Sequence, residues 1–141
     1  MAFVLKNPPE FTVEVNQWTR ETDADGAEMA KEIEKLLNNE VYLKTELERQ
    51  ERVALVALSA DGWTGEEAPY SQTVAVSGAE ERMEPVLVSA LEAGADGAAQ
   101  KAYSKAFALV SSGTARVGDG TATFQVYKKP AVDLVVGLKG V

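Results

Sequence analysis

Two kinds of hydrophobic pattern follow each other in the first 52 residues. Phe11, Val13 and Val15 alternate with polar residues after a pair of prolines, and this alternation predicts a short strand. From about residue 27 to residue 52 the chain lacks Gly and Pro and is rich in strong helix formers. This composition predicts a helix of about 26 residues, roughly 39 Å long. We therefore expect an N-terminal strand followed by a long amphipathic helix.

The apolar residues of this helix have the a/d spacing of a coiled coil. They are Met29, Ile33, Leu36, Leu43 and Leu47. Glu40 interrupts this seam, so the heptads alone do not decide an oligomeric state. Two interpretations are open: the helix lies across its own sheet, or it pairs with other copies in a short coiled coil. Asn38 and Asn39 are poor helix formers and are expected to face solvent.

Asp25 predicts the start of the helix. Its carboxylate can cap the first turn, with Glu28 reaching back as in a capping box. A calcium loop counted from Asp23 is the alternative. Its glycine, Gly26, would fall at the fourth position, whereas an EF-hand needs glycine at the sixth. The cap is the better interpretation, and we expect no metal site.

From Val53 onward the pattern changes to short strands around one helix. Strands at 53–58, 70–77 and 85–91 precede an alanine-rich helix that ends at a Ser-Ser-Gly sequence, residues 111–113. The Gly-Asp-Gly sequence at 118–120 predicts a hairpin turn, and an apolar strand follows near the end of the chain. The order β-β-β-α-β-β-β predicts a compact antiparallel α+β domain with a helix covering the sheet. We therefore expect two regions, a strand with a long helix in 1–52 and a β-rich domain, which we call the head, in 53–141.

A loop rich in aromatic residues and glycine leads into the second strand of the head. Trp63 and Tyr70 flank this loop, and Pro69 directs the chain into an extended conformation. The two rings could form a platform for a sugar or a peptide, or the indole could close the end of the β core. The second interpretation is favoured because large aromatic side chains are mostly buried. Trp63 and Tyr70 remain the candidates for ligand contact.

The charge of the chain limits its partners. It has 14 Lys and Arg against 22 Asp and Glu, a net charge of −8. Such a surface repels phosphate backbones and anionic lipids, so we expect no nucleic-acid and no membrane partner. No apolar run approaches a membrane span and the start lacks a signal-peptide pattern, so we expect synthesis in a cytoplasm without secretion.

The composition also removes most catalytic chemistry. The chain has no cysteine and no histidine, which excludes thiolate nucleophiles, imidazole metal ligands and the usual general base near pH 7. Paired carboxylates such as Glu66 and Glu67 could imitate a glycosidase pair, but such neighbours arise by chance in an acidic chain. We expect no enzymatic activity and no cofactor.

Several segments of 53–141 resemble one family. The sequences WTGEEAPYSQTVAVSG, PVLVSAL, AYSKAF, GTATFQVYKKP and VDLVVGLKGV resemble the small C-terminal module of fibre proteins in phages and prophages of Gram-positive bacteria. The upstream DADGAEMAKEIEKLLNNEVYLKTELE is similar to the helical segment before the head in tail, baseplate or head fibres. The resemblance implies a homotrimeric virion protein in which parallel helices bundle the chains and present β-rich heads for host attachment.

We therefore expect a non-enzymatic phage structural protein located in the virion. Its expected partners are further copies of the chain, most simply as a trimer, other virion proteins, and a glycan or protein on the host cell surface. A monomeric carbohydrate-binding or accessory module is the alternative. The oligomeric state distinguishes the two hypotheses.

Overall fold

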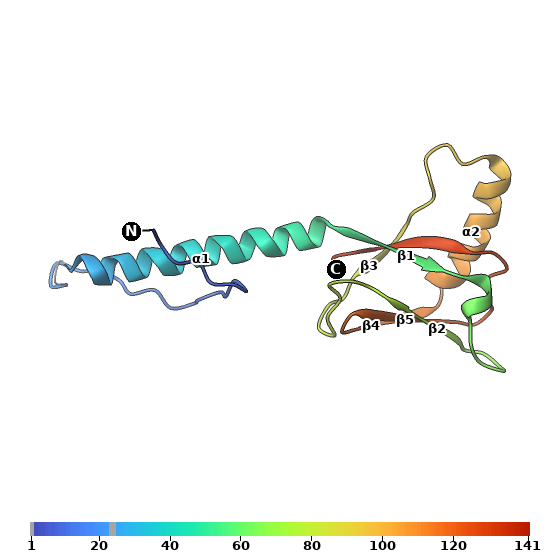
Figure 1. Ribbon diagram of the computed structural model, residues 1–141, viewed down its shortest axis with the longest axis horizontal. Helices are drawn as coiled ribbons and strands as arrows, with labels where there is room; N and C mark the ends of the chain where they lie inside the picture. Colours follow the sequence, from blue (N-terminus) through green and yellow to red (C-terminus); the bar gives the residue numbers. More distant parts are fainter. Residues whose placement is uncertain (1, 23–24) are drawn as a thin grey trace. The chain divides into compact units, whose positions relative to one another are not determined.

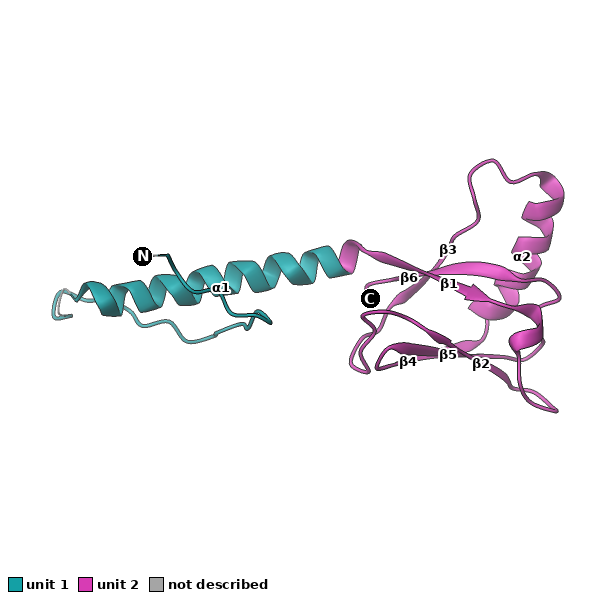
Figure 2. Cartoon of the chain, in the orientation of Figure 1, with its two compact units in different colours: residues 1–49 teal, residues 50–141 magenta. Residues whose placement is uncertain are grey.

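The computed structural model describes residues 2–22 and 25–141 (Figure 1). The chain forms two compact units, residues 1–49 and residues 50–141 (Figure 2). The boundary between the units falls at residues 49 and 50, whereas the sequence pattern placed it between residues 52 and 53. The predicted mixed α+β class, with the long helix before the strands, is confirmed.

The first unit contains most of one long helix, α1 (Gly26–Glu51). Asp25 caps its start: the Ala27 N–H donates to Asp25 Oδ1 over 2.8 Å, and the Met29 N–H donates to the Asp25 carbonyl over 3.0 Å. Glu28 pairs with Lys31 instead of reaching back to the cap. The calcium-loop alternative began at Asp23, which lies outside the described residues.

The predicted N-terminal strand is not formed. Within the described residues 2–22 the backbone is irregular and makes no β-ladder. We call residues 2–22 the strap, because they run beside α1 and are attached to its side chains. The alternating pattern around Phe11 and Val13 thus reflects an extended segment whose partner is a helix.

The second unit has the predicted order of strands and helix. Its elements are β1 (Val53–Leu58), a 3₁₀ turn (Ala60–Gly62), β2 (Tyr70–Ala75), β3 (Val86–Ser89), α2 (Gly97–Ser111), β4 (Thr114–Gly118), β5 (Thr121–Val126) and β6 (Leu134–Lys139). They form two three-stranded antiparallel sheets, ordered β1-β6-β3 and β2-β5-β4, where the pattern suggested one. The two central strands, β5 and β6, are therefore the last two of the chain.

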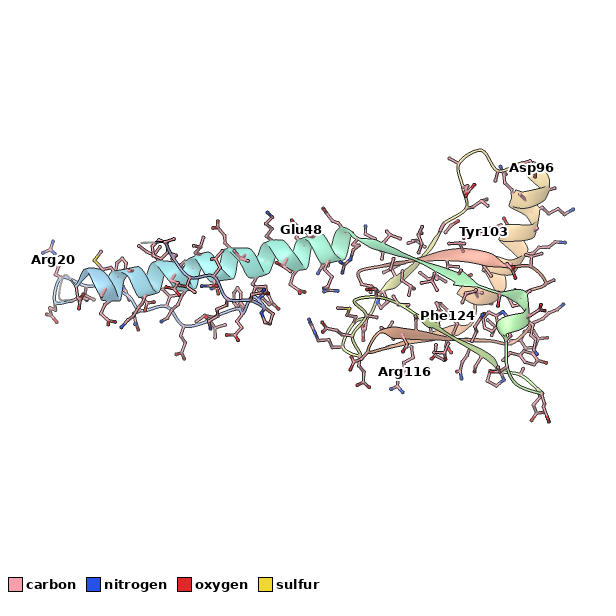
Figure 3. All side chains as sticks on the ribbon, viewed as in Figure 1. Arg20, Glu48, Asp96, Tyr103, Arg116 and Phe124 are labelled. Atoms are coloured by element: carbon pink, nitrogen blue, oxygen red, sulfur yellow. The ribbon has the colours of Figure 1, made fainter. Side chains whose placement is uncertain are left out.

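The core lies between the two sheets. One sheet contributes Val56, Leu58, Val136 and Leu138, and the other contributes Ala122, Phe124 and Val126, all at most 3% exposed. Figure 3 shows Phe124 between the sheets. The residues at 122, 124 and 126 alternate with more exposed ones along β5, and all three face this core. Burial of this two-sided core accounts for most of the hydrophobic stabilisation of the head.

Helix α2 packs on this sandwich through its Ala106 and Val110 side chains. Asp96 caps its start by accepting from the Ala99 N–H over 2.7 Å. At its other end Gly113 allows the chain to pass directly into β4, because a Cβ at this position would collide with the Gln125 carbonyl oxygen. The helix is thereby held close to both central strands.

Candidate functional site

The apolar seam of α1 is exposed along its whole length. The exposed fractions of Met29, Ile33, Leu36, Leu43 and Leu47 are 39%, 44%, 53%, 57% and 58%. Exposing such a helix face to water is unfavourable, because full burial of each large apolar side chain contributes about 1.5–3 kcal/mol of free energy. The five residues predicted as an oligomer interface thus remain about half exposed among the described residues, in two groups on either side of Glu40.

The strap is attached to a different face of α1 by polar side chains. In the heptad numbering of the seam, Glu32 and Asn39 are at g positions and Asn38 is at f, away from a and d. The Lys6 N–H donates to Asn38 Oδ1 over 2.7 Å. Asn39 pairs with both backbone groups of Thr12: its Oδ1 accepts from the N–H over 2.7 Å, and its Nδ2 donates to the carbonyl over 2.8 Å.

The prediction that Asn38 and Asn39 face solvent is therefore wrong. Asn38 is 3% exposed, and Asn39 is partly buried beneath the strap. Their amides satisfy backbone groups that a neighbouring strand would satisfy in a sheet. Sequence reasoning missed these residues because it weighed their low helix propensity and not their capacity to pair with an extended segment.

Glu32 is the third attachment point. Its carboxylate accepts from the backbone N–H and from Nδ2 of Asn16, each over 2.9 Å, and lies 2.8 Å from Lys35 Nζ. The side chain is 5% exposed. The hydrogen bond from Lys35 and then that from the Asn16 backbone lower the pKa of Glu32 below its ordinary value. Glu32 thus holds the strap as a carboxylate.

The strap itself exposes many apolar side chains. Phe11 contacts the Tyr42 ring, with the two ring centroids 5.7 Å apart. Seven strap residues nevertheless remain 43–86% exposed: Phe3, Val4, Leu5, Phe11, Val13, Val15 and Trp18. The first unit therefore exposes apolar side chains both along the seam of α1 and along the strap.

In the head, the loop before β2 serves mainly to close the core. Trp63 is 4% exposed and belongs to the core cluster, so it offers no ring face to a ligand. Gly62 passes close to the Gln72 side chain, where a Cβ would collide with the amide. The closure interpretation is thus the one that the burial of Trp63 supports.

Tyr70 behaves differently from Trp63. It is partly exposed, and Lys129 Nζ lies 4.7 Å from the centre of its ring. Lys129 in turn lines a groove of about 450 Å³ between α2 and the segment 128–132. The two residues predicted as ligand contacts therefore differ: Trp63 is buried in the core, and Tyr70 lies beside a surface groove.

A second hollow of about 330 Å³ lies beside Tyr103, between β1, β6 and the end of β3. The Tyr103 hydroxyl accepts from the Ala90 N–H over 2.9 Å and donates to the Val135 carbonyl over 2.8 Å. Both the donor and the acceptor function of the hydroxyl are used to join α2 to the sheet. Tyr103 therefore has a structural role.

The described residues include no group of three or more acidic side chains that could hold a metal ion. Within the same residues, no helix is both long and apolar enough to cross a membrane. Comparisons with known protein families, curated proteins and solved structures found no match to the chain. The exposed seam of α1 is the feature that the proposal below uses.

Proposed function

We propose that the chain is a structural component of a phage virion, a fibre or baseplate-associated protein without an enzymatic role. It assembles through the seam of α1 and displays residues 50–141 as a head for host attachment. The phage setting rests on the resemblance of the five head segments and the upstream helical segment to fibre proteins of phages that infect Gram-positive bacteria.

The exposed seam is the observation that carries the assembly proposal. Its residues are spaced by four, three, seven and four, and the seven-residue step contains Glu40 at an a position, so the apolar layers of parallel copies can interdigitate on either side of Glu40. The strap binds at f and g positions and leaves a and d free. A second copy of the chain is the occupant that fits a face with this period, and the family resemblance favours three copies.

Three copies would present three heads on one stem. Linked sites raise the effective concentration for the second and third binding events, so weak individual contacts gain avidity. A cell-surface glycan or protein is the expected host partner, and other virion proteins are the expected partners of assembly. The proposal assigns assembly to the first compact unit of the chain and attachment to the second.

Light scattering behind size exclusion tests this proposal. The native chain is expected to be a trimer at micromolar concentration, and Leu43→Asp is expected to be a monomer because it would remove one leucine per copy from the seam and add a second layer of carboxylates next to that of Glu40. Thr45→Asp is the matched control, since Thr45 lies two residues away on the same helix, is exposed, and occupies an outer f position. The control should remain a trimer.

The opposite results have a defined meaning. A native chain that stays monomeric over the whole concentration range overturns the assembly proposal and favours the monomeric carbohydrate-binding module. Equal dissociation of Leu43→Asp and Thr45→Asp would show that any negative charge on the helix is disruptive, and the seam would lose its assigned role.

A further inference from the structure

The two sheets of the head differ on the faces that point away from the core. In the sheet β2-β5-β4 the Thr73 hydroxyl lies 2.8 Å from that of Thr123, and the Gln125 amide donates to the Ser71 hydroxyl over 3.3 Å. The register places all four side chains on the outer face, because their neighbours along each strand face the core. We call this surface the outer polar face. It has the composition of an antiparallel sheet whose second face is in water.

The outer face of the sheet β1-β6-β3 is apolar instead. Leu55 and Val86 are 71% and 63% exposed, although they lie in strands. Between these strands Gly137 has no side chain, and a Cβ there would lie 2.6 Å from Val88 Cγ2 and 2.7 Å from Val53 Cγ1. We call this surface the outer apolar face. The register assigns six apolar side chains to it: Val53, Leu55, Ala57, Val86, Val88 and Val135.

Helix α2 does not serve as a cover for this face. It contributes Ala106 and Val110 to the core and stands at one end of the two sheets (Figure 2). Lys139 is the one charged residue that the register places on the outer apolar face, and it makes no ion pair within the described part of the chain. Its stem can lie on apolar surface while its charge stays in water. The face therefore suits an apolar partner.

The connection between α1 and β1 indicates which partner this is. Arg52 alone separates the end of α1 from Val53, and the last two residues of α1 belong to the same compact unit as β1. Neighbouring helices of a bundle have axes about 8–10 Å apart, so copies joined along α1 begin their β1 strands at about this separation. Sheets that pack face to face are also about 10 Å apart. Assembly through α1 thus brings identical sheets to the distance at which sheets pack.

We propose that the outer apolar face packs against the same face of neighbouring copies, while the outer polar face points away from them. This contact between heads rests on the proposed assembly and goes beyond it, since it adds a second interface outside the seam. It also assigns the outer polar face as the side of the head that stays accessible to a partner of another kind.

Distances between copies test the orientation of the heads. The chain has no cysteine, so a single introduced cysteine carries one spin label per copy. Ala57→Cys labels the outer apolar face, and Ala75→Cys is the matched control on the other sheet, since both alanines are exposed and lie in edge strands. Electron paramagnetic resonance on the full chain should place residues 57 of neighbouring copies about 10 Å apart. Residues 75 should be about 30 Å apart, because three sheet-to-sheet steps separate the two outer polar faces.

The strength of the contact is tested by a second pair of variants. Leu55→Asp should raise the dissociation constant of the oligomer at least tenfold, because it removes a leucine and buries a carboxylate. Thr73→Asp is the control, since Thr73 also points outward from an edge strand and is exposed, and it should change the constant less than twofold. Light scattering over a dilution series measures both, and circular dichroism checks that both variants remain folded.

The outcomes separate this inference from the assembly proposal. An oligomer in which residues 57 are no closer than residues 75, or which Leu55→Asp and Thr73→Asp weaken equally, overturns the contact between heads and leaves the seam intact. A chain that is monomeric throughout overturns both. An oligomer that survives Leu43→Asp but dissociates in Leu55→Asp supports the contact between heads and contradicts the seam alone.

Discussion

Glu32 makes the attachment of the strap depend on pH. Its pKa is lowered in the folded chain by Lys35 and by the Asn16 N–H, so the carboxylate is stabilised by being bound. A group with a lowered folded pKa stabilises the structure fully above its unfolded value, near 4.3, and loses that contribution as pH falls through the folded value. The Asn16 contact should therefore be complete above about pH 5 and weaken at lower pH.

Nuclear magnetic resonance can follow this change at single residues. As pH falls from 6 to 2, the Asn16 amide signal is expected to move together with the Glu32 side-chain carboxyl signal. Glu32→Gln removes the titrating group and should abolish this shared step. An Asn16 signal that does not respond in the native chain, or that responds equally in Glu32→Gln, would contradict the assignment.

The two asparagines show where sequence reasoning is incomplete at the level of residues. Helix propensity describes Asn38 and Asn39 as poor choices for the middle of a helix, and by itself this predicts exposure. It does not include the strap, whose backbone groups have no sheet to pair with and bond to the amides instead. The sequence did contain a signal. An extended segment without a partner strand is followed by a helix that carries two asparagines outside its apolar seam.

Among the elements, the hydrophobic pattern predicted the order of strands and helix in the head but not the division of the strands into two sheets. The apolar alternation in 122–126 marks which side chains are buried. It carries no information on which strands are neighbours, and β6 pairs with β1 and β3 across long separations in sequence. The groove beside Tyr70 was missed for the same reason, because Lys101 and Lys105 come together with Lys128 and Lys129 only when α2 packs beside the end of β5.

Tyr103 joins α2 to the sheet that contains β6. Tyr103→Phe leaves the Ala90 N–H and the Val135 carbonyl without this partner, and it should lower the free energy of unfolding of the head by about 1–2 kcal/mol. Chemical denaturation monitored by circular dichroism measures the change. Tyr127→Phe is the control, because Tyr127 is 80% exposed, and it should have almost no effect. Equal stability of the two variants would mean that water replaces the Tyr103 hydroxyl without cost.

At the scale of the whole molecule, the two units differ in how they satisfy their apolar residues. The head has an internal core, with Phe124 1% exposed and Leu58 and Val136 fully buried. The first unit leaves its seam and much of its strap in solvent. Because exposed apolar surface mediates protein–protein contacts, the first unit is expected to complete its burial with other copies of the chain.

The strap should then contribute to assembly beyond its own helix. It is attached at f and g positions, and in a parallel bundle the g positions lie toward the neighbouring helix, so its apolar side chains can reach the next copy. Val13 is 86% exposed, and Val13→Asp is expected to raise the dissociation constant of the trimer about tenfold, because the buried valine contributes about 1.5 kcal/mol. Gln17→Asp adds the same charge at an exposed strap position four residues away and should have little effect. Sedimentation over a dilution series measures both variants. A trimer that is weakened by Leu43→Asp but equally stable in Val13→Asp and Gln17→Asp would confine assembly to the seam, with the strap left as a surface for another virion protein.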